Sequence, residues 1–192
     1  MKRNAFLVSL VLASAAIGMS VICVNGQTPY VRPSAEKRFQ NYVKDTVGPG
    51  AWAGMVAGAG FATARNDPEE WGGKSKGFGK RLASNFGRNL IKNTITYSLD
   101  EALKLDSNYY RSEKRGVSDR IKNALLSTVT ARKPDGKRTV GIPRLVGTYS
   151  AGIISKETWY PPRYTWKDGV RSGTISLGTK ALINLVKEFI RR

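Results

Sequence analysis

The residue types that most often carry chemistry are scarce in this sequence. There is no histidine, and the only cysteine of the 192 residues is Cys23. A Ser-His-Asp triad and an ordinary zinc site are therefore excluded, because imidazole is the commonest general base and metal ligand. Asp100, Glu101 and Asp106 could collect a cation, but calcium loops space their ligands more densely. We expect no catalytic residue, metal or cofactor.

Adjacent carboxylates at Glu69 and Glu70 are the nearest approach to a catalytic pair. Neighbouring side chains diverge on a helix, and a two-carboxylate mechanism needs a defined separation. We interpret them as solvated loop residues. The alternative is an exported enzyme that acts on a cell-wall or polyanionic substrate through Glu69, Glu70 or Asp67.

Two short segments combine basic and aromatic residues. The candidate contacts with an anionic surface are Trp71, Lys74, Lys76, Phe78, Lys80 and Arg81 in the first segment and Arg163, Trp166 and Lys167 in the second. Such mixtures suit the interface of an anionic membrane. Solvated loops whose aromatic rings are tucked into the core have the same composition, so this alternative stays open.

The first 26 residues have the order of an export signal. Lys2 and Arg3 provide a positive start, and residues 5–24 carry no charge. We predict cleavage before Gln27, with cleavage after Ala16 as the second choice. An uncleaved membrane anchor through residues 5–24 is the alternative, since about 20 apolar residues can span a bilayer.

Cleavage would change both the thiol content and the charge. The full chain has a net charge of +18, and loss of the two basic residues of the signal leaves 30 basic and 14 acidic residues, or +16. The expected mature protein has no cysteine and therefore no disulfide. Its charge attracts polyanions. In the periplasm or cell envelope these are anionic lipids or envelope polymers, so nucleic acid is not the expected partner. The simpler interpretation is that the charge only keeps the protein soluble.

The spacing of apolar and turn-forming residues predicts a mainly α fold. We expect tightly packed helical hairpins with glycine- and alanine-rich helices, and one short β-hairpin around residues 127–142. The hairpin is indicated by the Pro-Asp-Gly turn at 134–136. The predicted organisation is a signal peptide at 1–26, an extended lead-in at 27–34 and a single helical domain at 35–192.

The uncharged, glycine-rich segment 51–64 is the most unusual part of that domain. Gly54, Gly58 and Ala62 are four residues apart, which on a helix allows close approach of another backbone. At ~1.5 Å per residue the segment reaches ~21 Å, short of the ~30 Å hydrocarbon core of a bilayer. We therefore expect a buried arm of a helical hairpin, and a helix lying in a membrane interface as the second choice.

The other expected elements follow from periodicity and capping. Ser34 should cap a helix that ends at the glycine and proline of 48–50. Residues 65–77 should form a loop, and a helical pattern follows to 105. Another helix should begin near Ser118, and residues 177–190 form an amphipathic helix. Its polar side holds Lys180, Asn184, Lys187, Glu188 and Arg191, and its apolar side holds Leu182, Leu185, Val186 and Phe189.

Several short segments also resemble known sequences. They are residues 63–72, 77–81, 93–95, 109–112, 159–161 and 187–189. On these residues the chain resembles an uncharacterised family of exported bacterial proteins that is frequent in acidobacteria. Similar proteins tend to have Asp-Pro-Arg-Tyr-Phe-Arg where this chain has residues 106–111. The resemblance implies export and supplies no known activity. Together these observations predict a non-enzymatic, envelope-associated protein.

Overall fold

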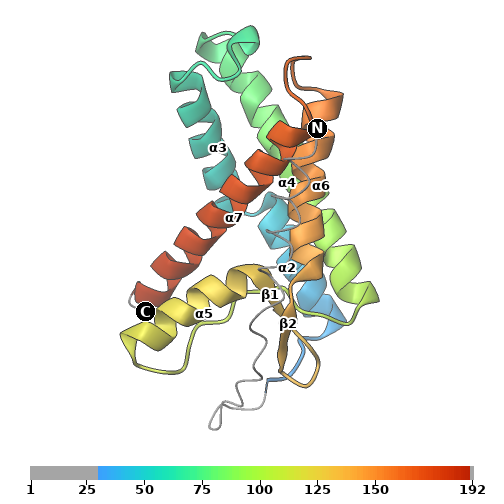
Figure 1. The fold of residues 1–192 in the computed structure, drawn as a ribbon, viewed down its shortest axis with the longest axis vertical. Coiled ribbons are helices and arrows are strands. Elements are labelled where there is room, and N and C mark those ends of the chain that lie inside the picture. Colours follow the sequence, from blue (N-terminus) through green and yellow to red (C-terminus); the bar gives the residue numbers. More distant parts are fainter. Residues whose placement is uncertain (1–29, 191–192) are drawn as a thin grey trace, which may run out of the picture.

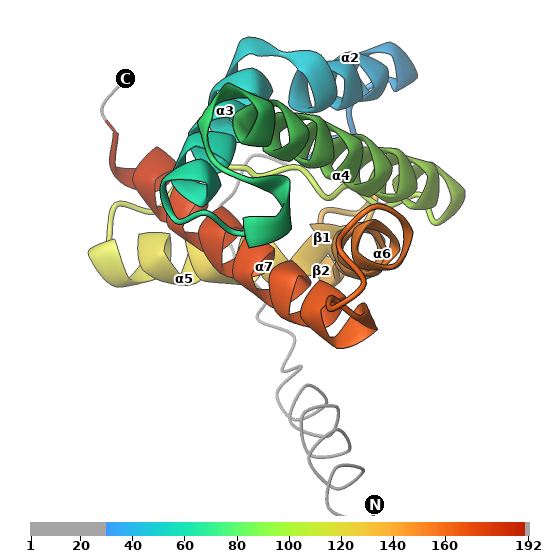
Figure 2. The same cartoon turned by 90° about the horizontal axis from the view of Figure 1, so that it is seen from above.

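The structure is a computed structural model that describes residues 30–190, so the expected signal peptide and the alternative anchor lie outside the described residues. The helices are α2 (Ala35–Val47), α3 (Pro49–Ala64), the short 3-10 helix η1 (Glu69–Trp71), α4 (Lys74–Ala102), α5 (Val117–Val129), α6 (Ile142–Thr158) and α7 (Trp166–Phe189). The mainly α prediction is confirmed (Figure 1). Seen from above, α4 lies between α2 and α3 on one side and α6 on the other (Figure 2).

The β-hairpin lies within the predicted range. β1 (Thr130–Arg132) pairs antiparallel with β2 (Arg138–Val140), and Ala131 lies opposite Thr139. An isolated bridge joins Asp106 to Arg132, so the segment after α4 continues this small sheet. The turn-forming residues at 134–136 predict this hairpin correctly, because its two strands are close together in the sequence.

Most helix termini agree with the sequence pattern, but the starts of α4 and α7 do not. α7 begins at Trp166, eleven residues before the predicted start at 177. The Ser34 hydroxyl accepts a hydrogen bond from the Lys37 N–H at 3.3 Å, as expected of the cap of α2. Pro49 then begins α3, where its missing N–H has no consequence. The loop that was expected to extend to Gly77 ends at residue 73, and the basic residues from Lys74 onward belong to α4.

Glycines make the contact between α6 and α7 very close. A Cβ atom at Gly169 would lie 2.6 Å from the Ile153 Cα, and one at Gly152 would overlap the Gly169 carbonyl oxygen. A Cβ at Gly147 would lie 2.6 Å from the Lys92 carbonyl oxygen of α4. These helices therefore touch backbone to backbone, which is the tight hairpin packing that the composition predicted.

The glycines of α3 lie in a different environment. No atom comes within 4 Å of a Cβ built at Gly54 or Gly60. The buried residues of α3 are Met55 and Ala59, whereas Phe61 is 65% exposed. The prediction that this segment is a buried arm is wrong, because α3 packs on α4 along one narrow side only.

The polarity of α7 is the reverse of an ordinary surface helix. Asn184 and Glu188, on its polar side, are buried, while Leu182 and Val186, on its apolar side, are 64% and 55% exposed. The Asn184 amide donates to the Ala124 carbonyl oxygen of α5 at 3.3 Å. The polar side of α7 therefore packs against α5, and Figure 2 shows these two helices side by side.

The interior of the described part is correspondingly small and polar. Apart from the prolines Pro68, Pro143 and Pro161, its buried apolar side chains are Met55, Ala59, Leu105, Ala124, Ala131 and Ala151. The buried polar and charged residues are Thr46, Arg81, Ser84, Asp106, Ser107, Ser127, Thr128, Arg144, Thr148, Ser155, Lys156, Asn184 and Glu188. Buried polar groups are stable only when hydrogen-bonded, so the fold depends on its polar contacts more than is usual.

Candidate functional site

The two basic-aromatic segments of the sequence meet at one end of the bundle. The Arg163 guanidinium contacts the carboxylates of Glu69 at 2.7 Å and Glu70 at 2.9 Å. The Trp71 ring lies 4.7 Å from that of Tyr160. The loop after α3 and the loop after α6 are thus joined, and the adjacent carboxylates of the enzyme alternative share one guanidinium there.

A second set of contacts strengthens the same junction. The Tyr164 hydroxyl donates to the Asp67 carboxylate at 2.7 Å. The Lys156 ammonium lies 3.3 Å from the ring centre of Tyr160 and 4.2 Å from that of Tyr164. Burial lowers the pKa of Lys156 to about 8. Asp67 therefore has a defined role in fastening the two loops together.

Arg81 must be removed from the predicted surface contacts. Its side chain is only 2% exposed. Its guanidinium donates to the carbonyl oxygens of Asp67 at 2.9 Å, Gly72 at 2.7 Å and Pro68 at 2.6 Å. Because the backbone takes up these donors, Arg81 holds the loop after α3 in shape and is not accessible to a surface.

The other predicted contact residues differ in accessibility. Trp71 and Phe78 are half-buried, so their rings support the junction more than they project from it. Arg163 is exposed, but its charge is taken up by Glu69 and Glu70. Of the predicted contact residues, those that are exposed and make no ion pair are Lys74, Lys76, Lys80, Trp166 and Lys167. These five remain candidates for an anionic surface.

Exposed apolar side chains occur on each α-helix from α2 to α7, and we call one set of them, on α3, α5 and α7, the outer apolar residues. They are Trp52, Val56 and Phe61 of α3, Val117, Ile121, Leu125, Leu126 and Val129 of α5, and Ile175, Leu182, Ile183, Val186 and Phe189 of α7. Large exposed apolar surfaces mark contacts with a membrane or another protein. Between residues 30 and 190, however, no helix is both long and apolar enough to cross a bilayer.

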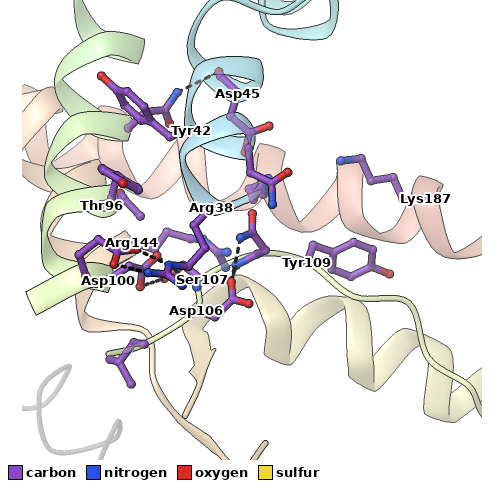
Figure 3. A pocket seen from close by; sticks show the side chains of 17 residues that line it. Arg38, Tyr42, Asp45, Thr96, Asp100, Asp106, Ser107, Tyr109, Arg144 and Lys187 are labelled. Atoms are coloured by element: carbon purple, nitrogen blue, oxygen red, sulfur yellow. Dashed lines mark hydrogen bonds and ion pairs between the residues drawn. The ribbon is translucent and has the colours of Figure 1, made fainter. Parts of the chain in front are cut away.

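A polar pocket of about 180 Å³ lies on another part of the molecule, between α2, α4, α6, α7 and the segment after α4 (Figure 3). The charged residues that line it are Arg38, Asp45, Asp100, Glu101, Asp106, Arg144, Lys180 and Lys187. Burial raises the pKa of Asp100 to about 6, although the Ser107 hydroxyl and N–H donate to it. The side chains that could bind a ligand here come from five separate segments.

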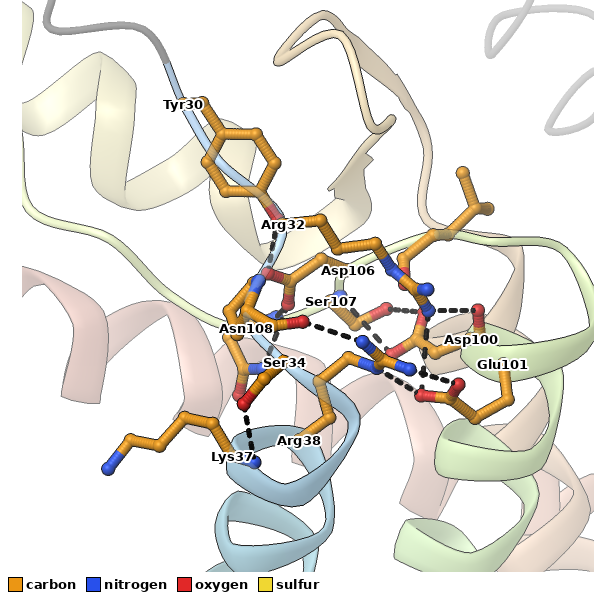
Figure 4. Close-up of polar contacts among 12 residues, drawn as sticks. Tyr30, Arg32, Ser34, Lys37, Arg38, Asp100, Glu101, Asp106, Ser107 and Asn108 are labelled. Atoms are coloured by element: carbon orange, nitrogen blue, oxygen red, sulfur yellow. Dashed lines mark hydrogen bonds and ion pairs between the residues drawn. The ribbon is translucent and has the colours of Figure 1, made fainter.

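The wall of the pocket near the start of α2 is already occupied by internal contacts (Figure 4). The Arg38 guanidinium binds both oxygens of Glu101, at 2.5 and 2.6 Å. Asp106 accepts hydrogen bonds from the hydroxyls of Tyr30 at 2.5 Å and Tyr110 at 2.6 Å. These contacts attach the segment before α2 to the domain, so residues 30–34 of the predicted lead-in are part of the folded structure.

The acidic cluster noted in the sequence does not become a metal centre. Among the described residues, no group of three or more Asp, Glu, His or Cys side chains could hold a metal ion. Glu101 is bound by Arg38, and Asp106 is surrounded by hydroxyl donors. The sequence pattern does not indicate that cationic residues lie opposite this cluster. In the pattern, Lys180 and Lys187 are only part of the polar side of an amphipathic helix.

Comparisons with known proteins find no matching family model, no similar curated protein and no similar solved structure. The resemblance to exported acidobacterial proteins therefore stays a prediction. The function has to be inferred from the geometry of this chain.

Proposed function

We propose that this protein associates with an anionic membrane surface through the outer apolar residues of α3, α5 and α7. The observation that carries the proposal is the reversed polarity of α7, with Asn184 buried and Leu182 exposed. In water such an arrangement places apolar side chains in solvent. Against lipid it is favourable, because the apolar side contacts the acyl boundary, while the Asn184 amide N–H and the Glu188 carboxylate find hydrogen-bond partners within the protein.

The charge of the chain supports an anionic rather than a neutral membrane. The net charge is +18, and each basic residue near an anionic surface contributes about 1 kcal/mol of attraction. One exposed cation, Lys167, lies near the start of α7 and outside the polar side of the helix. Its ammonium group could stay at the headgroups while the apolar residues enter the interface. The binding mode is interfacial, and no chemical step is proposed.

A flotation experiment with the full chain tests this proposal. Wild type should float with vesicles of phosphatidylglycerol and phosphatidylcholine at low salt and less well at high salt, since screening weakens the attraction. A Leu182→Ser, Val186→Ser double variant should bind about tenfold or more weakly, because each exposed aliphatic side chain contributes on the order of 1 kcal/mol on burial. A Val31→Ser variant is the control, since Val31 is 79% exposed but precedes α2.

Two results would contradict the proposal. One is the absence of wild type from anionic vesicles at low salt. The other is equal binding by wild type and the α7 double variant. Self-association that depends on Leu182 and Val186, without vesicle binding, would instead identify these helix faces as a protein interface.

A further inference from the structure

The cationic side of the polar pocket brings basic residues from three helices together. Arg144 comes from α6, and Lys180 and Lys187 come from α7. Figure 3 shows Lys187 extending from α7 toward α2. Lys92 of α4 is near enough for its charge to act on Lys180. Basic residues from separate helices do not gather unless something offsets their repulsion.

No carboxylate forms an ion pair with these cations among the described residues. Among the described residues, Lys180 and Lys187 make no ion pair or hydrogen bond, and Lys92 donates only to the Asn89 side-chain oxygen, at 3.0 Å. Arg144 donates to backbone carbonyl oxygens, including that of Thr128 at 3.2 Å. Hydrogen bonds to neutral acceptors satisfy the donors but leave the positive charges uncompensated.

The carboxylates of the same pocket compensate this charge only in part. Glu101 is paired with Arg38, whereas Asp106 accepts hydrogen bonds from two neutral tyrosine hydroxyls and keeps its negative charge. Asp45, Asp100 and Asp106 therefore face Arg144, Lys92, Lys180 and Lys187. One positive charge remains uncompensated, and an anion bound beside Lys180 and Lys187 would neutralise it.

The size of the pocket limits the ligand to a small one. A volume of about 180 Å³ corresponds to roughly six water molecules at ~30 Å³ each. Pockets for drug-sized ligands measure about 300–1,000 Å³. We infer that this pocket binds a small phosphate-bearing anion, with Lys180, Lys187 and Arg144 as the cationic ligands. The inference does not depend on the proposed membrane association.

Binding of the anion should depend on the protonation of Lys180. Burial lowers its pKa to about 8, with further lowering by Arg144, Lys187 and Lys92 and an opposing effect of Asp45. Lys180 is charged below pH 8 and loses its proton as the pH rises above it. Affinity for a phosphate dianion should therefore fall as the pH rises from 7.5 to 9.5.

Calorimetric titration of the full chain with inorganic phosphate tests the assignment. At pH 7.5 wild type should bind phosphate, and Lys187→Met should bind it about tenfold more weakly, since a charge-assisted contact is lost. Lys187 is exposed, so the variant should keep its fold. Lys167→Met is the matched control, because Lys167 is an exposed lysine of the same helix outside the pocket.

Two further variants test the sign of the electrostatics. Asp45→Asn removes a competing negative charge and should strengthen phosphate binding. Lys180→Arg keeps its charge at pH 9.5, so it should retain the binding that wild type loses there. The inference is overturned if wild type does not bind phosphate at pH 7.5. It is also overturned if Lys187→Met binds as wild type does, or if Asp45→Asn binds more weakly.

The source of the phosphate group can be resolved by two probes. Glycerol 1-phosphate tests a soluble monoester, and vesicles with phosphatidic acid test a lipid headgroup at equal surface charge against phosphatidylglycerol. A preference for phosphatidic acid that Lys187→Met abolishes indicates the lipid. Binding of glycerol 1-phosphate without that preference indicates a soluble ligand. Phosphate binding without any vesicle binding would contradict the membrane proposal alone.

Discussion

α3 and the α6–α7 pair are both rich in glycine and alanine, but their glycines lie in different surroundings. In α7, a Cβ atom at Gly169 would lie 2.6 Å from a backbone atom of α6. In α3, a Cβ atom at Gly54 would meet nothing within 4 Å. The four-residue spacing that predicts close packing is present in both regions, but only between α6 and α7 does it bring two helix backbones into contact.

The comparison teaches that small-residue spacing permits a close contact but does not create one. Close approach also needs a neighbouring helix whose backbone lies directly opposite the glycines. α6 supplies this for α7, where Gly152 and Gly169 face each other. On its outer side α3 has no such neighbour among the described helices, so Gly54 and Gly60 have open space around them, and Phe61 is exposed nearby.

The largest effect should come from filling the α6–α7 contact. Gly169→Ala should destabilise the protein by about 1–3 kcal/mol, because the added methyl would overlap the backbone at Ile153 and overpacking has a cost of this size. Urea unfolding followed by circular dichroism measures the change. Gly178→Ala is the control, since it lies in the same helix with nothing within 4 Å. Equal stabilities of these variants would mean that α6 and α7 are not in close contact.

A smaller effect should distinguish the inner from the outer side of α7. Asn184→Ala should lower the free energy of unfolding by about 1–2 kcal/mol, because it removes the hydrogen bonds to Ala124 and Thr128 in a buried site. Leu182→Ala, on the outer side, should change it by no more than about 0.5 kcal/mol. Chemical denaturation of both variants gives the comparison. If Leu182→Ala costs more than Asn184→Ala, then α7 packs with its apolar side inward.

The smallest expected effect is a gain in stability within α3. Gly54→Ala should stabilise the protein by about 0.5–1 kcal/mol, because alanine is the better helix former and the space is open. Thermal unfolding should show a slightly higher midpoint. A loss of stability would instead reveal that another helix or a second chain approaches Gly54, which would restore the buried arm that the sequence suggested.

Prediction from the sequence succeeded where the signal was local. Ser34 caps α2, the 134–136 turn closes the hairpin, and the proline-rich segment after Trp159 separates α6 from α7. In each case one or two residues determine the local backbone through a hydrogen bond or a fixed dihedral angle. Such effects do not depend on which other segment lies nearby.

The candidate sites were predictable only in part. The sequence indicates the two basic-aromatic segments. It does not indicate that Arg163 pairs with Glu69 and Glu70, because these residues are about 94 positions apart and no local pattern reports such a contact. Arg81 was grouped with its exposed neighbours, although it is the one whose side chain turns inward. The polar pocket was missed for the same reason, since five segments build it.

The sequence by itself determined the helical fold class, the hairpin, the excess of positive charge and the lack of histidine. These depend on composition and on contacts between near neighbours in the chain. Only the tertiary structure decided which side of each helix is inside. An amphipathic pattern in α7 has two sides, and the pattern alone does not say that Asn184 and Glu188 would find hydrogen-bond donors and acceptors on α5 and the segment before it. Because Asn184 and Glu188 find these partners inside the protein, the apolar side of α7 faces outward.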